Sequence, residues 1–173
     1  YIRVAGWTVK PLREMFDHPV FSASGLAGFW SELMSSFWRG EFYWYREGLA
    51  SRWCDVFYYS SSLPFVLASG IGLLQNYENT ERVADRLCFL MFGLSAVMLV
   101  AMSMLYDFGK WVSPSREFPW FAAGRLISGT LVPFLILYLK GLDLVLARVN
   151  IRVNRLLALV PIVALMTISE VVI

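Results

Sequence analysis

A long apolar run near the end of the chain limits what this sequence can fold into. No charged residue occurs from Leu126 to Leu139, and Arg125 and Lys140 border the run. Fourteen helical residues cover roughly 21 Å, less than the roughly 30 Å hydrocarbon core of a bilayer. Long cationic side chains can reach the headgroup layers from inside the apolar region, so the flanks can supply the missing length. We therefore predict a membrane-spanning helix over residues 119–146.

Composition extends this prediction to the whole chain. The sequence is 58% hydrophobic and 16% charged, whereas soluble domains are roughly 25% charged. Its net charge of +2 comes from dispersed basic residues, which argues against a nucleic-acid partner. Three further apolar runs, over residues 56–75, 87–106 and 156–173, are long enough to cross a bilayer. We predict an all-α, polytopic membrane protein with about four transmembrane helices, forming a bundle over residues 56–173.

The first 55 residues are predicted to form an outer-face, interfacial segment. Within it, residues 26–39 place six large apolar side chains on one half of a helical wheel: Phe29, Trp30, Leu33, Met34, Phe37 and Trp38. Ser24 could cap the start of this amphipathic helix, and Gly40 could end it. Two interpretations fit the apolar stripe equally. The helix lies in the membrane interface, or it packs on its own transmembrane bundle.

Aromatic residues are also dense in the segment 41–55, which includes Trp53. Their amphipathic side chains suit the headgroup level of a membrane, although such aromatics can also stack on sugar rings. Inside the first predicted crossing, Pro64 should loosen the helix, and the serines at 60–62 could satisfy the freed backbone groups. Small residues at Ala68 and Gly72 predict a close helix contact, and Gly93 with Ala96 predicts a weaker one.

Catalytic and metal-binding motifs are not recognisable in the sequence. It contains no phosphate-binding glycine loop, dinucleotide fingerprint or nucleophile elbow, so we predict no cofactor and leave the catalytic residue unknown. His18 is the only histidine, which disfavours a metal site. It is expected to have a structural role or to share proton transfer with Asp17. Cys54 and Cys88 fall near opposite membrane faces, so both are expected to be packing residues.

The orientation follows from arginine positions. The turn from Arg148 to Arg155 holds three arginines and no acid, which predicts a cytoplasmic location. Alternation then places residues 1–55 and 107–117 outside and residues 75–86 inside. The chain starts without methionine and stops within an apolar run, so we expect a piece of a longer membrane protein, with the remainder of the parent chain as a partner.

The aromatic segment SSFWRGEFYWY and the later segment FPWFAAGRLISGTLVPFLILYLKGLD carry a resemblance across residues 27–146. Together with Gly124-Arg125 and Pro133-Phe134, they resemble the later part of bacterial polytopic membrane proteins allied to the lipid-linked-sugar glycosyltransferases. The resemblance implies a protein of a bacterial inner or plasma membrane that handles a polyprenyl-phosphate sugar at the outer membrane face. In that superfamily the catalytic carboxylate usually lies in an early outer loop, and no residue here matches it. The alternative is a non-enzymatic membrane component, such as a transporter or assembly subunit.

Two residues are predicted to form a site. Arg125 begins an apolar helix, where the helix dipole disfavours a cation, so a lipid phosphate should lie nearby. An ordinary headgroup would satisfy this as well as a carrier phosphate. Glu170 lies fifteen residues after Arg155, as Arg125 lies fifteen before Lys140. In an antiparallel hairpin the two opposite charges reach equal depth, so Glu170 should pair with Arg125 or reach outer-surface water.

Overall fold

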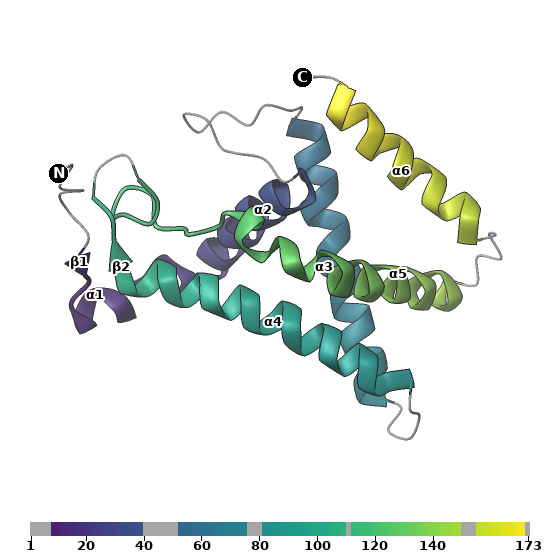
Figure 1. Ribbon diagram of the computed structural model, residues 1–173, viewed down its shortest axis with the longest axis horizontal. Helices are drawn as coiled ribbons and strands as arrows, with labels where there is room; N and C mark the ends of the chain where they lie inside the picture. The colour runs from purple at the N-terminus through teal and green to yellow at the C-terminus, as the bar shows by residue number, and fades with distance from the viewer. Residues whose placement is uncertain (1–7, 40–51, 76–80, 110–111, 150–154, 172–173) are drawn as a thin grey trace.

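The computed structural model describes residues 8–39, 52–75, 81–109, 112–149 and 155–171 (Figure 1). Most of these residues are helical, which supports the all-α class. The described residues also include one antiparallel pair of two-residue strands, which the sequence did not predict. The elements follow in the order β1 (Thr8–Val9), α1 (Leu12–Phe16), η1 (Pro19–Phe21), α2 (Ala23–Arg39), α3 (Arg52–Gln75), α4 (Glu81–Leu105), β2 (Tyr106–Asp107), η2 (Gly124–Thr130), α5 (Leu131–Arg148) and α6 (Arg155–Val171), where η denotes a 3₁₀ helix.

Three segments are long and apolar enough to cross a membrane: Arg52–Leu74, Val83–Leu105 and Gly124–Arg148. They correspond to three of the four expected crossings and are compatible with a membrane-embedded protein. Helices α3 and α4 begin four and six residues earlier than expected, so part of the predicted polar turn at 75–86 is helical. Helix α6 has 17 residues, and its role as a fourth crossing stays a prediction.

Helix α2 lies at the centre of the fold. It contains residues 26–39, and its apolar stripe is packed on the chain's own helices. Phe37 contacts the rings of Phe92 in α4 and Phe134 in α5. The division of the chain at residue 55 stays a prediction, as does the position of α2 relative to a membrane surface, but α2 and the three candidate spans share one core.

Helices α3 and α5 cross at a glycine. A Cβ built on Gly141 would lie 1.8 Å from the backbone oxygen of Phe65, so no other residue fits this crossing without movement. The small-residue pair predicted on α3 also faces α5, because Gly72 lies against Leu144. Gly93 has no neighbouring atom within 4 Å of such a Cβ. The weaker contact predicted for Gly93 is therefore not made there within the described part of the chain.

The predicted helix over residues 119–146 is wrong in its first part. Residues 119–123 are not helical, and η2 comprises two short turns joined at Ile127, whose φ of −109° and ψ of 16° are not helical. The α-helix begins only at Leu131. Pro133 is its third residue, a position where the missing N–H removes no intrahelical bond. The segment is apolar, but apolar composition alone does not distinguish an α-helix from a non-helical stretch whose backbone groups form hydrogen bonds with side chains.

Local signals near the start of the chain were partly correct. Asp17 and His18 separate α1 from η1. The cap of α2 is formed two residues before the predicted Ser24, because Ser22 Oγ accepts from the backbone N–H of Gly25 at 3.0 Å. Gly40, the aromatic residues at 42–45 and the turn at 150–154 lie outside the described residues.

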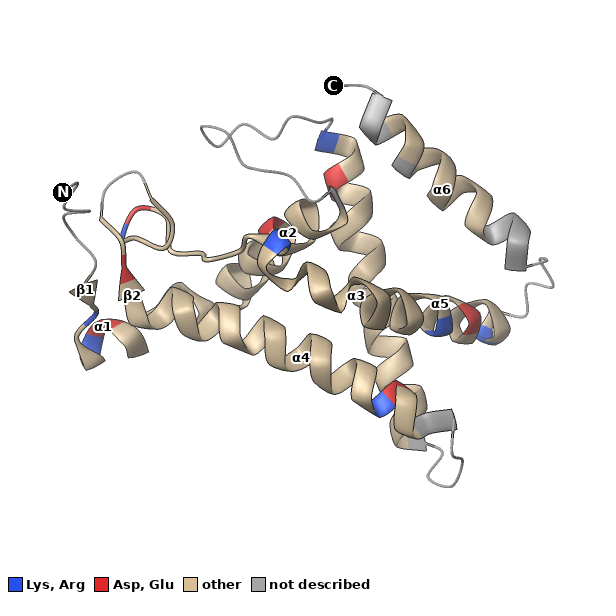
Figure 2. Cartoon of the chain, in the orientation of Figure 1, with Lys and Arg blue, Asp and Glu red and all other residues tan. Residues whose placement is uncertain are grey.

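Charged residues of α4 occur only in its first turns, and residues 87–105 are uncharged, as Figure 2 shows. At the C-terminal end of α4, strand β1 pairs with β2, with Thr8 opposite Asp107 and Val9 opposite Tyr106. The N-terminal segment and the residues after α4 therefore lie at the same end of the bundle, as they would if both lay on one side of a membrane. Which side is outside stays a prediction.

Candidate functional site

The stretch over residues 119–124, before α5, is held by side chains from two other helices, α2 and α4. The Ser36 hydroxyl of α2 donates to the oxygen of Ala122 at 2.7 Å and accepts from the N–H of Gly124 at 2.9 Å. From α4, Ser103 Oγ accepts from the N–H of Phe121 at 2.7 Å. Non-helical backbone is tolerated at membrane depth only where protein or water satisfies its polar groups. These hydroxyls do so here.

A close backbone approach fixes the same stretch sterically. A Cβ on Gly124 would lie 2.3 Å from both the Cα and the nitrogen of Phe37. Because these are backbone atoms of α2, they cannot turn aside as a side chain could. Trp120 adds an edge-to-face contact with Phe29, at a centroid distance of 6.1 Å. The stretch is therefore a rigid support for the residue that follows it.

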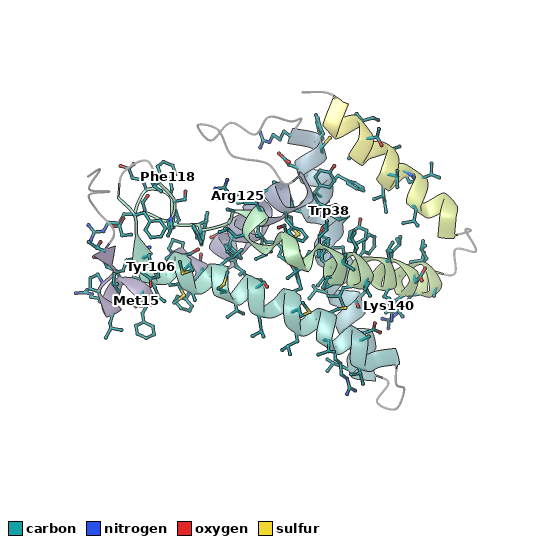
Figure 3. All side chains as sticks on the ribbon, in the orientation of Figure 1. Met15, Trp38, Tyr106, Phe118, Arg125 and Lys140 are labelled. Atoms are coloured by element: carbon teal, nitrogen blue, oxygen red, sulfur yellow. The ribbon has the colours of Figure 1, made fainter. Side chains whose placement is uncertain are left out.

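That residue is Arg125, the one candidate binding residue whose side chain the structure places. It is the second residue of η2, and its side chain is exposed. Figure 3 shows it where the segment before α5 passes α2. A guanidinium carries five donors in a planar fork and stays charged at any physiological pH, which suits it to a phosphate. Arg125 was predicted to begin a membrane-spanning helix, but it lies in the 3₁₀ segment η2, six residues before α5 begins.

The structure does not describe the side chain that was predicted to pair with Arg125. Glu170 belongs to α6, but its side chain lies outside the described residues. Helix α6 contacts α3. The ion pair between Arg125 and Glu170 therefore stays a prediction.

An ion pair that sequence reasoning missed lies toward the other end of α5. The ammonium of Lys140 contacts both carboxylate oxygens of Asp85 in the first turns of α4. The Asp85 side chain is 10% exposed and the Lys140 side chain 44% exposed, so the carboxylate is buried while the cation retains access to the surface. Asp85 was assigned to a polar turn. The early start of α4 places it on a helix instead, facing α5.

A polar cap at the C-terminal end of α4 was also missed. The backbone N–H of Lys10 donates to the oxygen of Leu105, and its Nζ donates to the oxygen of Ser103, both at 2.8 Å. These two bonds satisfy carbonyls that a helix end otherwise leaves open. Burial lowers the pKa of the Lys10 amine below its ordinary value, and the carboxylates of Asp107 and Glu14 partly oppose this. Arg116 binds the Glu14 carboxylate with two hydrogen bonds, at 2.9 and 3.2 Å, across the outside of the cap.

His18 joins this cap to the non-helical stretch. Its Nδ1 accepts from the N–H of Val20 at 3.2 Å, so Nε2 carries the proton and donates to the oxygen of Pro119 at 3.3 Å. Burial lowers the pKa of His18 below its ordinary value, opposed by the bond to Pro119 and assisted by the charge of Lys10. Both nitrogens of the neutral ring are therefore engaged in hydrogen bonds, which agrees with the structural role and gives no support to proton transfer with Asp17.

A wall of aromatic rings forms where α2, α3 and α5 pack together. Trp38 stacks on Tyr58 at 5.4 Å and 14°, and it contacts the edges of Phe134 and Tyr138. The polar atoms are bonded within the wall, because Trp38 Nε1 donates to Ser62 Oγ and the Tyr138 hydroxyl donates to Ser61 Oγ. Ser61 and Ser62 therefore form hydrogen bonds with these rings. Ser60 and Ser61 also donate to the carbonyls of Phe57 and Tyr58. This wall is part of the packed core.

The described residues contain neither a candidate metal-binding group nor an exposed cysteine. No group of three His, Cys, Asp or Glu side chains there is arranged to hold a metal ion. Cys54 and Cys88 are both buried and free, as expected of packing residues. No family model matches the chain, and comparisons with curated proteins and with solved structures find no similar protein. The chemistry of exposed residues, Arg125 above all, is therefore the basis for a functional proposal.

Proposed function

We propose that this chain is a multi-pass, four-helix unit of an integral membrane protein that binds the phosphate of a polyprenyl-phosphate-linked sugar at Arg125. The observation that carries the proposal is the exposed guanidinium of Arg125 on a support fixed by Ser36 and by the contact of Gly124 with Phe37. A cation on a rigid base loses little conformational freedom on binding an anion, which favours affinity.

The surroundings of Arg125 are consistent with a headgroup-level position. Trp120 and Phe121 precede it, and the apolar helix α5 follows it. Aromatic residues and arginines favour this boundary between acyl chains and water. In the proposal α6 is the fourth crossing, because 17 helical residues reach roughly 26 Å, and the Arg125 end faces outward.

The enzymatic part of the proposal is glycosyl transfer from the carrier lipid. Binding a carrier phosphate would hold the sugar near the membrane surface, where an acceptor could approach it. The transfer step itself is assigned to none of the described residues. If the chain instead belongs to a non-enzymatic component, Arg125 would contact ordinary lipid headgroups, and carrier phosphate would have no advantage over them.

Separate binding titrations with the two lipids distinguish these outcomes. The complete protein in detergent micelles would be titrated with a polyprenyl phosphate and, separately, with phosphatidylglycerol. We expect tighter binding of polyprenyl phosphate and a roughly tenfold loss of that affinity in Arg125→Gln, since charge-assisted bonds contribute about 1.5–3 kcal/mol. Arg13→Gln, an exposed arginine on α1, is the matched control. Equal affinities for the two lipids, or an unchanged affinity in Arg125→Gln, would contradict the carrier-binding role.

A further inference from the structure

An apolar groove runs between α3 and α5 at the end of α5 that is remote from Arg125. Its volume is about 310 Å³, at the lower limit of small-ligand sites. The lining residues are Pro64, Leu67, Ala68, Ile71, Gly72, Leu144, Val145 and Arg148. Among these, Arg148 is the charged one, and it is the last residue of α5.

The shape of the groove follows from small residues on α3. Ala68 and Gly72 have little or no side chain, so they form a low floor. Leu67 and Ile71 beside them are 53% and 48% exposed, and Leu144 borders the opposite side. Because the crossing at Gly141 and Phe65 fixes the two helices in close contact, the groove is a permanent feature of their packing.

The position of the charge matches an amphipathic ligand. From Pro64 to Gly72 the groove follows about 12 Å of helix α3, a length of apolar surface suited to an acyl chain. Arg148 supplies a cation at the helix end, eight residues beyond Lys140. Arg148 is exposed at this end of α5, five residues beyond Asp143. Basic sites between membrane helices bind anionic headgroups in this way.

We propose that this groove binds one acyl chain of an anionic phospholipid, whose phosphate pairs with Arg148. The proposal concerns a lipid of the bilayer at the end opposite to Arg125, and it does not depend on the carrier-lipid site. A competing explanation for Arg148 alone is that a cation at a helix C-terminus is stabilised by the helix dipole. That explanation predicts no preference among lipids, so a lipid comparison decides between them.

The first test measures lipid-dependent thermal unfolding of the complete protein in maltoside micelles. Palmitoyl-oleoyl phosphatidylglycerol should raise the Tm more than palmitoyl-oleoyl phosphatidylcholine, because a ligand that binds the folded state stabilises it. Arg148→Gln should remove at least half of the phosphatidylglycerol-specific shift, and Arg148→Lys should keep most of it. Arg13→Gln, at an exposed arginine of α1, should behave as the wild type. Equal shifts with the two lipids, or an unchanged shift in Arg148→Gln, would overturn the proposal.

The second test fills the groove. Ala68→Phe should reduce the shift with phosphatidylglycerol, whereas Ala84→Phe, at an exposed alanine on α4, should not. If Ala68→Phe does not fold, Val145→Trp fills the groove from the α5 side. A full shift in the filled variant would refute the acyl-chain contact. Glycerol 3-phosphate that reproduces the lipid effect, or a shift that grows with protein concentration, would instead assign the site to free phosphate or to a second copy of the chain and overturn the proposal.

Discussion

Removing the Ser36 hydroxyl should loosen the stretch before α5 more than any exposed serine change. Ser36 is 1% exposed, and Ser36→Ala would leave the oxygen of Ala122 and the N–H of Gly124 without their hydroxyl partner. Each buried polar group left unsatisfied costs about 1–3 kcal/mol. Alanine forms helix better than serine, which returns about 0.5 kcal/mol, and some relaxation will follow. We expect a net loss of about 2–4 kcal/mol in the free energy of unfolding.

The measurement is equilibrium unfolding of the complete protein in mixed micelles, followed by far-UV circular dichroism as sodium dodecyl sulfate increases. Ser95→Ala is the matched control, because Ser95 lies on α4 and its hydroxyl donates to Met91 one turn earlier in the same helix. Hydrogen exchange adds a local readout: the amide of Gly124 should exchange faster in Ser36→Ala. If Ser36→Ala costs no more than Ser95→Ala, and the amide exchange is unchanged, the hydroxyl does not hold this stretch.

Three further predictions test other contacts. Lys140→Gln and Asp85→Asn should each lower the free energy of unfolding by about 1–3 kcal/mol, and a double-mutant cycle should show coupling of at least about 1 kcal/mol; no coupling would mean that the pair is incidental. Burial lowers the pKa of His18, so its stabilising effect is complete above about pH 6.5 and is lost as the pH falls below that value. Melting curves at pH 7.5 and 5.5 should therefore differ less in His18→Gln than in the wild type. Gly141→Ala should destabilise by about 1–3 kcal/mol, because its Cβ meets a backbone oxygen of α3. Gly93→Ala, in open space, should be neutral or slightly stabilising in the same denaturation assay.

Sequence periodicity and apolar length located the helical parts of α2, α3, α4 and α5, because burying an apolar stripe or crossing a bilayer imposes a pattern on nearby residues. The stretch before α5 left no such pattern. Its partners Ser36 and Ser103 lie up to 88 residues away in the sequence, and an apolar composition fits either conformation. The close spacing of Pro119, Gly124 and Pro133 is the signal that could have revealed it.

For the candidate sites too, the sequence indicates features that depend on neighbouring residues but not contacts between residues far apart in the chain. The sequence placed Arg125 at the start of the apolar run, since a charge beside uncharged residues is a local feature. The bond from Lys10 to the end of α4 joins residues 93 positions apart, and the contact of Lys140 with Asp85 joins residues 55 apart. Neither pairing follows from spacing along one helix. The length of the polar turn before α4 was overestimated, and this concealed the role of Asp85.

The hydrogen bonds around the non-helical stretch also bear on how the protein is made. Ser36 and Ser103, which hold residues 121–124, both precede that stretch in the chain. Synthesis runs from the N-terminus, so α2 and α4 leave the ribosome before their non-helical partner does. The polar backbone groups of residues 121–124 can therefore pass directly to waiting hydroxyls rather than remain unsatisfied in lipid. A circular permutant in which residues 119–148 are synthesised first would lack this order, and it should insert less efficiently even though every contact of the finished fold is preserved.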